Sequence, residues 1–363
     1  MSSMWGEQIK ISVFGGSHTE AIGVTIDGLP AGEAISMDAV LEQMSRRAPG
    51  RDLASTTRKE ADVPQVISGL SENHVISGDP LCALIYNTNQ RSKDYSELRI
   101  KPRPGHADFP ASVKFNGCND IRGGGHFSGR LTAPLVFAGA VCRQILEKKG
   151  IYIGAHALSI SHVIDEAFNP VTINQEKLQK LSSEYFAVQS SEAKEKMYEE
   201  IEKARLNCDS VGGVIECAVI GLPVGLGRHM FGGVENVLSS IIFGVPAVKG
   251  IEFGEGFHAS DLKGSENNDS FFYDNNLVKA KTNHSGGVLG GMTNGMPLLF
   301  KVAMKPTASI SQEQKTVNLQ TKTDDTLKII GRHDPCIVPR AIPVIESVTA
   351  IAIAELMSRS GLL

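Results

Sequence analysis

Apolar and polar positions alternate with a period of two near the start of the chain. Residues 9–14 and 22–26 follow this pattern, which predicts two strands joined by a turn at Gly15-Gly16-Ser17-His18. The apolar run 82–86 is typical of a buried strand. Between these strands, Ser36 and the periodic residues that follow it predict a helix that continues to Met44. The turn therefore presents Ser17 and His18 at the end of a strand, where side chains commonly contact ligands.

Longer apolar runs in the rest of the chain predict helices over 131–146, 234–243 and 340–357, the last with Pro343 near its start. The runs 214–220 and 297–304 predict strands, while 245–250 predicts a turn and 264–269 a mobile loop. The segment 174–206 is rich in charged residues at helical spacing, which predicts peripheral helices without chemistry. Strands and helices alternate too irregularly for a doubly wound sheet, so the pattern predicts an α+β fold.

Basic residues and glycine turns concentrate between Arg99 and Arg130. This stretch holds six basic residues against two acids, with His106 and His126 among them, and it contains a Pro-Arg-Pro-Gly turn and a triple glycine. By itself, a basic turn is more often a solvated surface. However, similar polar clusters recur beside other glycine and proline turns. Exposed backbone N–H groups and arginine forks bind phosphate and carboxylate groups well, so we interpret the stretch as an anion site.

Two segments have the features of phosphate cradles. Residues 122–130 precede a predicted helix, whose free N–H groups and dipole favour phosphate, and this places Ser128 and Arg130 in one anion site. The paired glycines of 286–291 and the run Lys305-Pro-Thr-Ala-Ser form a second candidate. The chain contains neither a Walker A loop nor a dinucleotide-binding Gly-x-Gly-x-x-Gly motif, which disfavours a phosphotransferase.

Composition narrows the class of protein. A net charge of -4 argues against a general nucleic-acid binder, and the six cysteines form no Cys-x-x-Cys pair, which favours a reduced, cytoplasmic setting. The histidines lack metal-ligand spacing, so no protein-held metal is predicted. The N-terminus does not have the pattern of a signal peptide, and no uncharged run reaches the length of a membrane span. These features suit an enzyme that acts on a small phosphorylated substrate beside a phosphate-bearing cofactor.

Six motifs, taken in order, resemble the chorismate synthase family from about residue 5 to residue 357. They lie at 14–20, 103–108, 122–130, 283–291, 305–309 and 331–335. The resemblance implies one domain over 1–363 with a β-α-β sandwich fold, assembled as a homotetramer. It also implies 1,4-elimination of phosphate from 5-enolpyruvylshikimate 3-phosphate, with reduced FMN bound and no net redox change. The product is chorismate, at the last common step of the shikimate pathway to the aromatic amino acids.

The resemblance also implies roles for individual residues. His18 matches the histidine that protonates the departing phosphate, and His106 the one that protonates or stabilises reduced flavin. Asp334 matches the acid that, with Ser17 and Ser128, helps the flavin N5 to accept the substrate proton. The candidate substrate ligands are all arginines: Arg46, Arg47, Arg51, Arg103, Arg130 and Arg332. The candidate flavin contacts are His126, Phe127, Ser128, Pro246, Ala247, Gly290, Lys305, Pro306, Thr307, Ala308, Ser309 and Arg332.

The chain departs from the family pattern at several positions. Glutamate is common where this chain has Gly16 and Leu131, arginine where it has His126, and serine where it has Ala308. An arginine that contacts the cofactor is common where it has Leu53, and Arg51 is the candidate substitute. We expect these changes to affect binding strength more than reaction type.

No flavin reductase domain is evident in the sequence, so we expect an external reductant, for which NADPH is a candidate source. A non-catalytic module that binds phosphate ligands or flavin is the alternative, since it would not need His18, His106 and Asp334. Product formation distinguishes these two functions.

Overall fold

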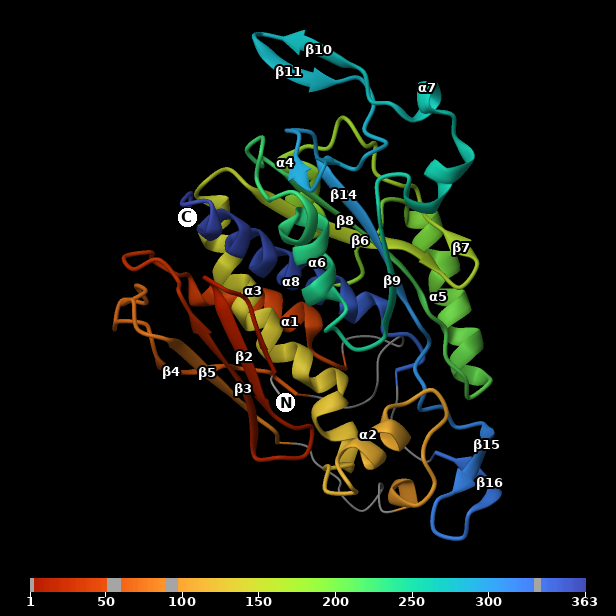
Figure 1. The fold of residues 1–363 in the computed structure, drawn as a ribbon. Helices are drawn as coiled ribbons and strands as arrows, with labels where there is room; N and C mark the ends of the chain where they lie inside the picture. Colours follow the sequence, from red (N-terminus) through yellow and green to blue (C-terminus); the bar gives the residue numbers. More distant parts are fainter. Residues whose placement is uncertain (1–2, 51–59, 89–96, 330–333) are drawn as a thin grey trace.

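The computed structural model describes residues 3–50, 60–88, 97–329 and 334–363. In this part of the chain, two five-stranded antiparallel sheets enclose a layer of helices (Figure 1). This arrangement confirms the predicted α+β class and the β-α-β sandwich.

The first sheet is built from the N-terminal strands, in the order β1-β2-β3-β5-β4. Its inner face is apolar, because alternate residues such as Ile22, Val24 and Ile26 point toward the helices. The turn between β2 and β3 carries Ser17 and His18, as predicted. The strands are β1 (Met4–Trp5), β2 (Lys10–Gly15), β3 (Ala21–Asp27), β4 (Gln65–Ser68) and β5 (Leu81–Tyr86).

The second sheet has the order β7-β6-β8-β14-β9. β6 was not predicted, because both of its faces are covered, one by α8 and the other by α4, so its sequence does not alternate. The turn predicted over 245–250 is wrong at its end, because β9 begins at Val248 and pairs with β14. The strands are β6 (Tyr152–Ile160), β7 (Val163–Ile164), β8 (Gly213–Ile220), β9 (Val248–Phe253) and β14 (Leu298–Met304).

The helix layer consists of α1 (Met37–Arg47), α3 (Thr132–Glu147), α6 (Val234–Ile242) and α8 (Val338–Arg359). α3 packs on β2, β3 and β5, and α8 packs on α3, β6 and β8. A Cβ atom at Gly139 would lie 2.2 Å from that of Ser347, so glycine is required where α3 and α8 cross. α8 is long and apolar enough to span a membrane, but 94% of that window is buried inside the fold, which identifies a core helix.

The remaining elements lie around this sandwich. The charged segment forms α4 (Gln175–Leu181) and α5 (Ser191–Leu206), as predicted, and they pack outside the second sheet. The loop predicted over 264–269 contains a short helix instead, α7 (Gly264–Asn267), whose N-terminus is closed by a hydrogen bond to Glu266. Small elements complete the structure: α2 (Asp108–Lys114), β10 (Phe271–Asp274), β11 (Leu277–Ala280), β12 (Val288–Leu289), β13 (Met292–Thr293), β15 (Glu313–Asn318) and β16 (Thr323–Lys328).

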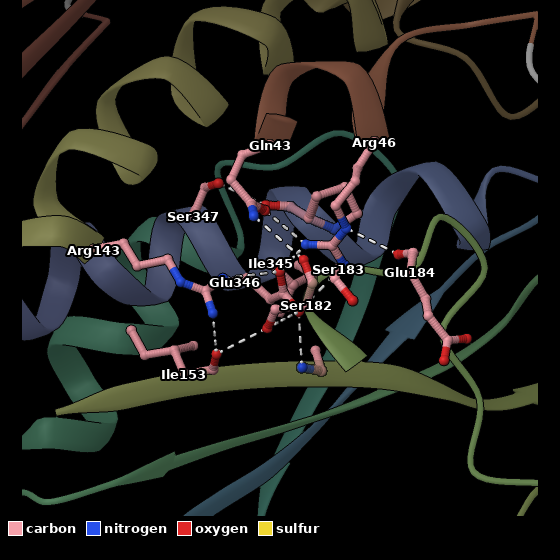
Figure 2. A network of polar contacts seen from close by, with 12 residues as sticks. Gln43, Arg46, Arg143, Ile153, Ser182, Ser183, Glu184, Ile345, Glu346 and Ser347 are labelled. Carbon is pink, nitrogen blue, oxygen red and sulfur yellow. Dashed lines mark hydrogen bonds and ion pairs between the residues drawn. The ribbon is translucent and has the colours of Figure 1, made fainter. Parts of the chain in front are cut away.

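A buried polar network connects three helices of the middle layer to the second sheet (Figure 2). Its centre is Glu346 of α8, which accepts hydrogen bonds from Arg46 Nη1 of α1 at 2.5 Å and from the backbone N–H of Ala155 in β6 at 3.0 Å. Arg143 of α3 and Ser182 lie within 3.5 Å of the same carboxylate. Because both charges of the central pair are buried, each depends on the other for its stability.

A second buried cluster lies within the second sheet and its edge. His156 of β6 contacts Asp165 through Nδ1 at 3.2 Å and Glu216 of β8 through Nε2 at 2.9 Å. Burial alone would lower the pKa of His156, but its hydrogen bonds to the two carboxylates raise it above the ordinary value. The imidazolium form is therefore favoured in the folded protein.

This cluster predicts a pH-dependent contribution to stability. The pKa of His156 is higher in the folded than in the unfolded chain, so its contribution is complete below about pH 6.5 and is lost as the pH rises through the folded pKa. We therefore expect the stability advantage of the natural protein over His156→Gln to shrink as the pH is raised from 6.5. Urea unfolding of both proteins across this range measures it, and a constant difference would contradict the assignment.

Candidate active site

A cavity of about 580 Å³ lies where the C-terminal end of α1 meets the segments that precede α3 and α8. Five of the sequence motifs or clusters that were singled out above contribute to its wall. They are the Ser17 turn, the Arg103 turn, the glycine-rich run that ends at Arg130, the Lys305 run and the segment around Asp334. The fold thus brings together basic and polar segments that are more than 300 residues apart in the chain.

The three glycines 123–125 form a stretch of backbone against which two histidine side chains pack. All three have positive φ values of 57°, 83° and 55°, which L side chains rarely adopt. A Cβ atom at Gly123 would lie 2.5 Å from the His18 ring, and one at Gly124 would lie 3.2 Å from His106 Nε2. The triple glycine is therefore needed for both imidazoles to pack against this backbone.

His18 and Ser17 occupy the turn that follows β2. The His18 side chain is buried, and its Nδ1 lies 3.2 Å from Ser17 Oγ. The Ser17 N–H donates to the Gly125 carbonyl at 3.1 Å, which fixes the turn against the glycine run. Ser17 lines the cavity directly, and His18 lies just behind it.

His106 belongs to a compact group with Arg103 and Asp108. His106 Nδ1 lies 2.7 Å from Asp108 Oδ1, and Arg103 donates from Nε and Nη2 to the two oxygens of the same carboxylate. Arg103 Nη1 also donates to Ser309 Oγ at 2.9 Å. Burial would raise the pKa of Asp108, but its hydrogen bonds from Arg103 and His106 hold it well below its usual range. The ionised Asp108 fixes the orientation of both cavity residues.

Arg47 and Arg130 form a second cationic group in the cavity wall. Both contact the carboxylate of Asp62, and Arg130 Nη1 also lies 3.1 Å from Glu60 Oε2. Burial, together with the neighbouring Arg340 and Arg130, lowers the pKa of Arg47 to about 10, although Asp62 opposes this shift. The Arg47 guanidinium group therefore remains charged near neutral pH, and Asp62 supports that charge.

Asp334 lies at the entrance to α8. Arg340, in the first turn of α8, forms an ion pair with the Asp334 carboxylate and also donates from Nε to the Arg47 carbonyl at 3.0 Å. Arg340 therefore connects Asp334 to the end of α1.

Most of the predicted flavin contacts lie in a further region of the cavity wall. Lys305 Nζ donates to the Gly105 carbonyl at 2.5 Å, and burial together with Lys249 lowers the pKa of Lys305. Ala247 has a positive φ of 76°, and its carbonyl accepts the Lys305 N–H at 2.9 Å. The wall here is formed by Pro246, Ala247, Lys249, Lys305, Pro306, Thr307, Ala308 and Ser309.

His126, Phe127 and Ser128 border this region. His126 contacts Ser3 Oγ at 2.6 Å and the Gly15 carbonyl at 2.9 Å, so its ring also holds the N-terminal segment. Phe127 is 42% exposed and packs edge-on against Phe115. Ser128 Oγ accepts the Arg130 N–H at 3.3 Å, which closes the turn before α3. These three residues all line the cavity.

Two predicted ligands lie elsewhere. Among the described residues, the cavity wall includes neither Arg46 nor Gly290. Consecutive residues on a helix point about 100° apart, so Arg47 faces the cavity while Arg46 faces Glu346 inside the helix layer. Gly290 lies in the turn between β12 and β13. The predictions for Arg51, Arg332 and Leu53 lie outside the described residues.

The acids that orient the cavity arginines were not predicted as site residues. Each described arginine of the wall contacts a carboxylate, and these carboxylates belong to Glu60, Asp62, Asp108 and Asp334. Of these, only Asp334 was predicted. Asn87, which accepts a hydrogen bond from Arg130 Nε, and Arg340 were also missed. The signal in the sequence was weak, because Glu60 and Asp62 sit in a polar connection without a motif.

The cavity retains unused hydrogen-bonding capacity. Within the described part of the chain, Arg130 Nη2 and Thr307 Oγ1 are both buried without a hydrogen-bond partner. Buried polar atoms are rarely left unpaired in native proteins, so these two atoms are candidate hydrogen-bonding groups for a ligand. A phosphorylated ligand, including a flavin mononucleotide, fits this combination of an unpaired guanidinium nitrogen, a lysine and a hydroxyl group.

Known proteins resemble the chain over nearly all of its length. A family model described as chorismate synthase matches residues 9–358. The chorismate synthase of Dehalococcoides mccartyi (strain ATCC BAA-2266) is 44% identical over 363 residues, which cover 100% of this chain and 98% of that protein. The chorismate synthase of Thermococcus kodakarensis is 44% identical over 356 residues, with 98% of each chain covered. A crystal structure of chorismate synthase has a TM-score of 0.76 at 25% identity, and covers 98% of this chain and 93% of that chain.

Proposed function

Because this chain belongs to the chorismate synthase family, we propose that its cavity binds 5-enolpyruvylshikimate 3-phosphate beside reduced FMN. The activity is that of the family, a lyase reaction that releases phosphate and forms chorismate. The observation that carries the proposal for the site is the convergence of Arg47, Arg103 and Arg130 on one cavity, each oriented by a buried carboxylate. Such preorganised charges favour a phosphate dianion.

We assign the substrate phosphate to Arg47 and Arg130, because both guanidinium groups contact Asp62 and one nitrogen of Arg130 has no hydrogen-bond partner among the residues that the structure describes. His18, behind Ser17, supplies the proton to the departing phosphate. This role requires an oriented imidazole, and the contact of His18 Nδ1 with Ser17 Oγ at 3.2 Å supports it. Arg103 and Arg332, the latter outside the described residues, complete the set of proposed substrate ligands.

The second part of the proposal concerns the flavin. The wall from Pro246 to Lys249 and from Lys305 to Ser309, with residues 126–128, would hold FMN, and Lys305 together with Thr307 suits its phosphate. When bound, reduced FMN supplies the electronic chemistry of the elimination. His106, oriented by its contact with Asp108, is assigned to protonating or stabilising reduced flavin. Asp334, with Ser17 and Ser128, takes part in removing the substrate proton.

We also propose a single domain over residues 1–363 that assembles as a homotetramer and receives reduced flavin through an external reductant, with NADPH as a candidate source. The shared helix layer between the two sheets supports the single domain. Light scattering coupled to size exclusion tests the tetramer. Flavin reduction by added NADPH, measured with and without a separate flavin reductase, tests the source of the reductant.

The direct test of the function mixes the purified protein anaerobically with photoreduced FMN and 5-enolpyruvylshikimate 3-phosphate. We expect equal amounts of chorismate and phosphate, with the flavin still reduced at the end. Flavin binding without release of either product would instead indicate a binding protein. Oxidation of flavin in proportion to product would contradict a reaction without net redox change.

Asp334→Asn provides a sharper test of the proton-transfer assignment. The asparagine keeps the shape of the side chain and can still accept a hydrogen bond from Arg340, but it cannot take up a proton. We expect FMN affinity to be retained while turnover falls by about 100-fold or more. Asp324→Asn, at an exposed site on β16, is the control. Unchanged turnover of the Asp334 variant would remove this residue from the proton transfer.

A further inference from the structure

Asp62 is a buried acid that lies between two of the proposed phosphate ligands. Its side chain is 0% exposed, and one carboxylate oxygen contacts Arg47 Nη1 at 2.6 Å while the other contacts Arg130 Nη1. We propose that Asp62 is a positioning residue that sets the spacing and direction of these two guanidinium groups for the substrate phosphate. This inference rests on the proposed function, because it requires Arg47 and Arg130 to bind that phosphate.

The hydrogen-bond donors of the two arginines can be accounted for one by one. Arg47 donates from Nε to Thr132 Oγ1 and from Nη2 to the Gly129 carbonyl, both at 3.0 Å, and from Nη1 to Asp62. Its guanidinium group is therefore held on three sides. The plane of Arg47 is fixed before any ligand binds.

Arg130 is held in a different way. Its Nε donates to Asn87 Oδ1 at 2.9 Å, and its Nη1 contacts both Asp62 and Glu60. Among the described residues, Nη2 has no hydrogen-bond partner although it is buried. A guanidinium group is a rigid planar fork, so fixing Nε and Nη1 also fixes the direction of Nη2. Asp62 thereby directs the one terminal nitrogen that remains for a ligand.

Charge provides a second reason for an acid at this position. Arg47 and Arg130 would repel one another in a buried site. The substrate phosphate can offset this repulsion only while it is bound, so the free enzyme needs another negative charge. Burial would raise the pKa of Asp62, but Arg47 and Arg130 lower it below the usual value, so the carboxylate is ionised at neutral pH. Asp62 thus keeps both cations close together in the free enzyme.

The backbone conformation positions the Asp62 carboxylate. Asp62 has a φ of 52°, in the left-handed region that aspartate and asparagine enter more readily than most other non-glycine residues. Here the conformation carries the carboxylate from the connection before β4 into the space between α1 and the segment before α3.

Asp62→Asn tests the proposal, because the amide keeps the size of the side chain but replaces one acceptor oxygen with a donor. We expect the KM for 5-enolpyruvylshikimate 3-phosphate and the inhibition constant of inorganic phosphate to rise by about 10- to 100-fold. The Kd of FMN should stay close to that of the natural protein, whereas the melting temperature should fall, because two buried guanidinium groups lose their shared carboxylate. Asp274→Asn, which removes an exposed ion pair with Lys279 on the β10–β11 hairpin, is the matched control and should change none of these quantities.

A double-mutant cycle with Arg130→Gln separates positioning from general stability. If Asp62 acts through Arg130, adding Asp62→Asn to Arg130→Gln should raise KM much less than it does in the natural protein. The proposal would be overturned if the double variant raised KM by the product of the two separate factors. It would also be overturned if FMN affinity fell by as much as substrate affinity. If Asp62→Asn does not fold, Glu60→Gln is the alternative variant, because it weakens the other ion pair of Arg130 Nη1. An increased KM with unchanged FMN affinity then supports the proposal, and an unchanged KM overturns it.

The failure of this inference can be distinguished from a failure of the proposed function. An increased KM in Arg130→Gln together with an unchanged KM in Asp62→Asn would overturn only the role of Asp62. An unchanged KM in Arg130→Gln would overturn the assignment of Arg130 to the substrate, and the role of Asp62 with it.

Discussion

We expect His18→Ala to lower turnover by about 100- to 10,000-fold, because a positioned general acid contributes rate enhancement of this size. The departing phosphate is the leaving group of the reaction, and without His18 its proton must come from water. The side chain is held against Ser17 Oγ and the glycine run, so its orientation does not depend on the substrate. Anaerobic product formation with photoreduced FMN, at saturating substrate, measures the effect.

Two comparisons make the His18 result specific. His162→Ala removes an exposed histidine near Glu200, outside the cavity, and should leave turnover unchanged. The FMN affinity and far-UV circular dichroism of His18→Ala should match those of the natural protein, since His18 lies in a turn and not in the main core. Near-normal turnover of His18→Ala would exclude it as the general acid.

The largest effect on stability is expected from Glu346→Ala. This change leaves the guanidinium group of Arg46 buried without its carboxylate and also removes the acceptor for the Ala155 N–H. Breaking a buried ion pair in this way costs about 3–5 kcal/mol in the free energy of unfolding. Equilibrium denaturation in urea, followed by circular dichroism, measures the difference.

Two further variants test the explanation. Replacing both partners, as Arg46→Met with Glu346→Leu, should recover much of the loss, because no unpaired charge remains and apolar side chains fill the space. Glu202→Ala breaks an exposed pair with Arg205 on α5 and should leave the unfolding midpoint unchanged. If Glu346→Ala were no more destabilising than Glu202→Ala, the network of Figure 2 would not stabilise the fold.

Arg46 and Arg47 show that residue type alone does not predict which side chain faces the cavity. Both belong to one basic cluster in the sequence, and both were candidates for the substrate. The helix directs them to different surroundings, so Arg47 lines the cavity while Arg46 lies with Glu346 in the helix layer. Only the packing of α1 against α3 and α8 decides which arginine faces the cavity.

The sequence by itself determined the fold class, most of the long helices and the chemistry-bearing turns. These features depend on local causes: the period of apolar residues, Ser36 as a helix cap, and glycines that permit positive φ. It also identified the family, because six motifs occur in a fixed order. His18, His106 and Asp334 could therefore be singled out before their neighbours in space were known.

The tertiary structure alone decided which acids accompany these residues, and it also placed β6 in the second sheet. Asp62 and Arg130 are distant in the chain, and their contact exists only because the connection before β4 folds against the segment before α3. β6 lacks alternation because helices cover both of its faces. In each case the stabilising contact comes from residues far away in the sequence, and a local pattern carries no information about such partners.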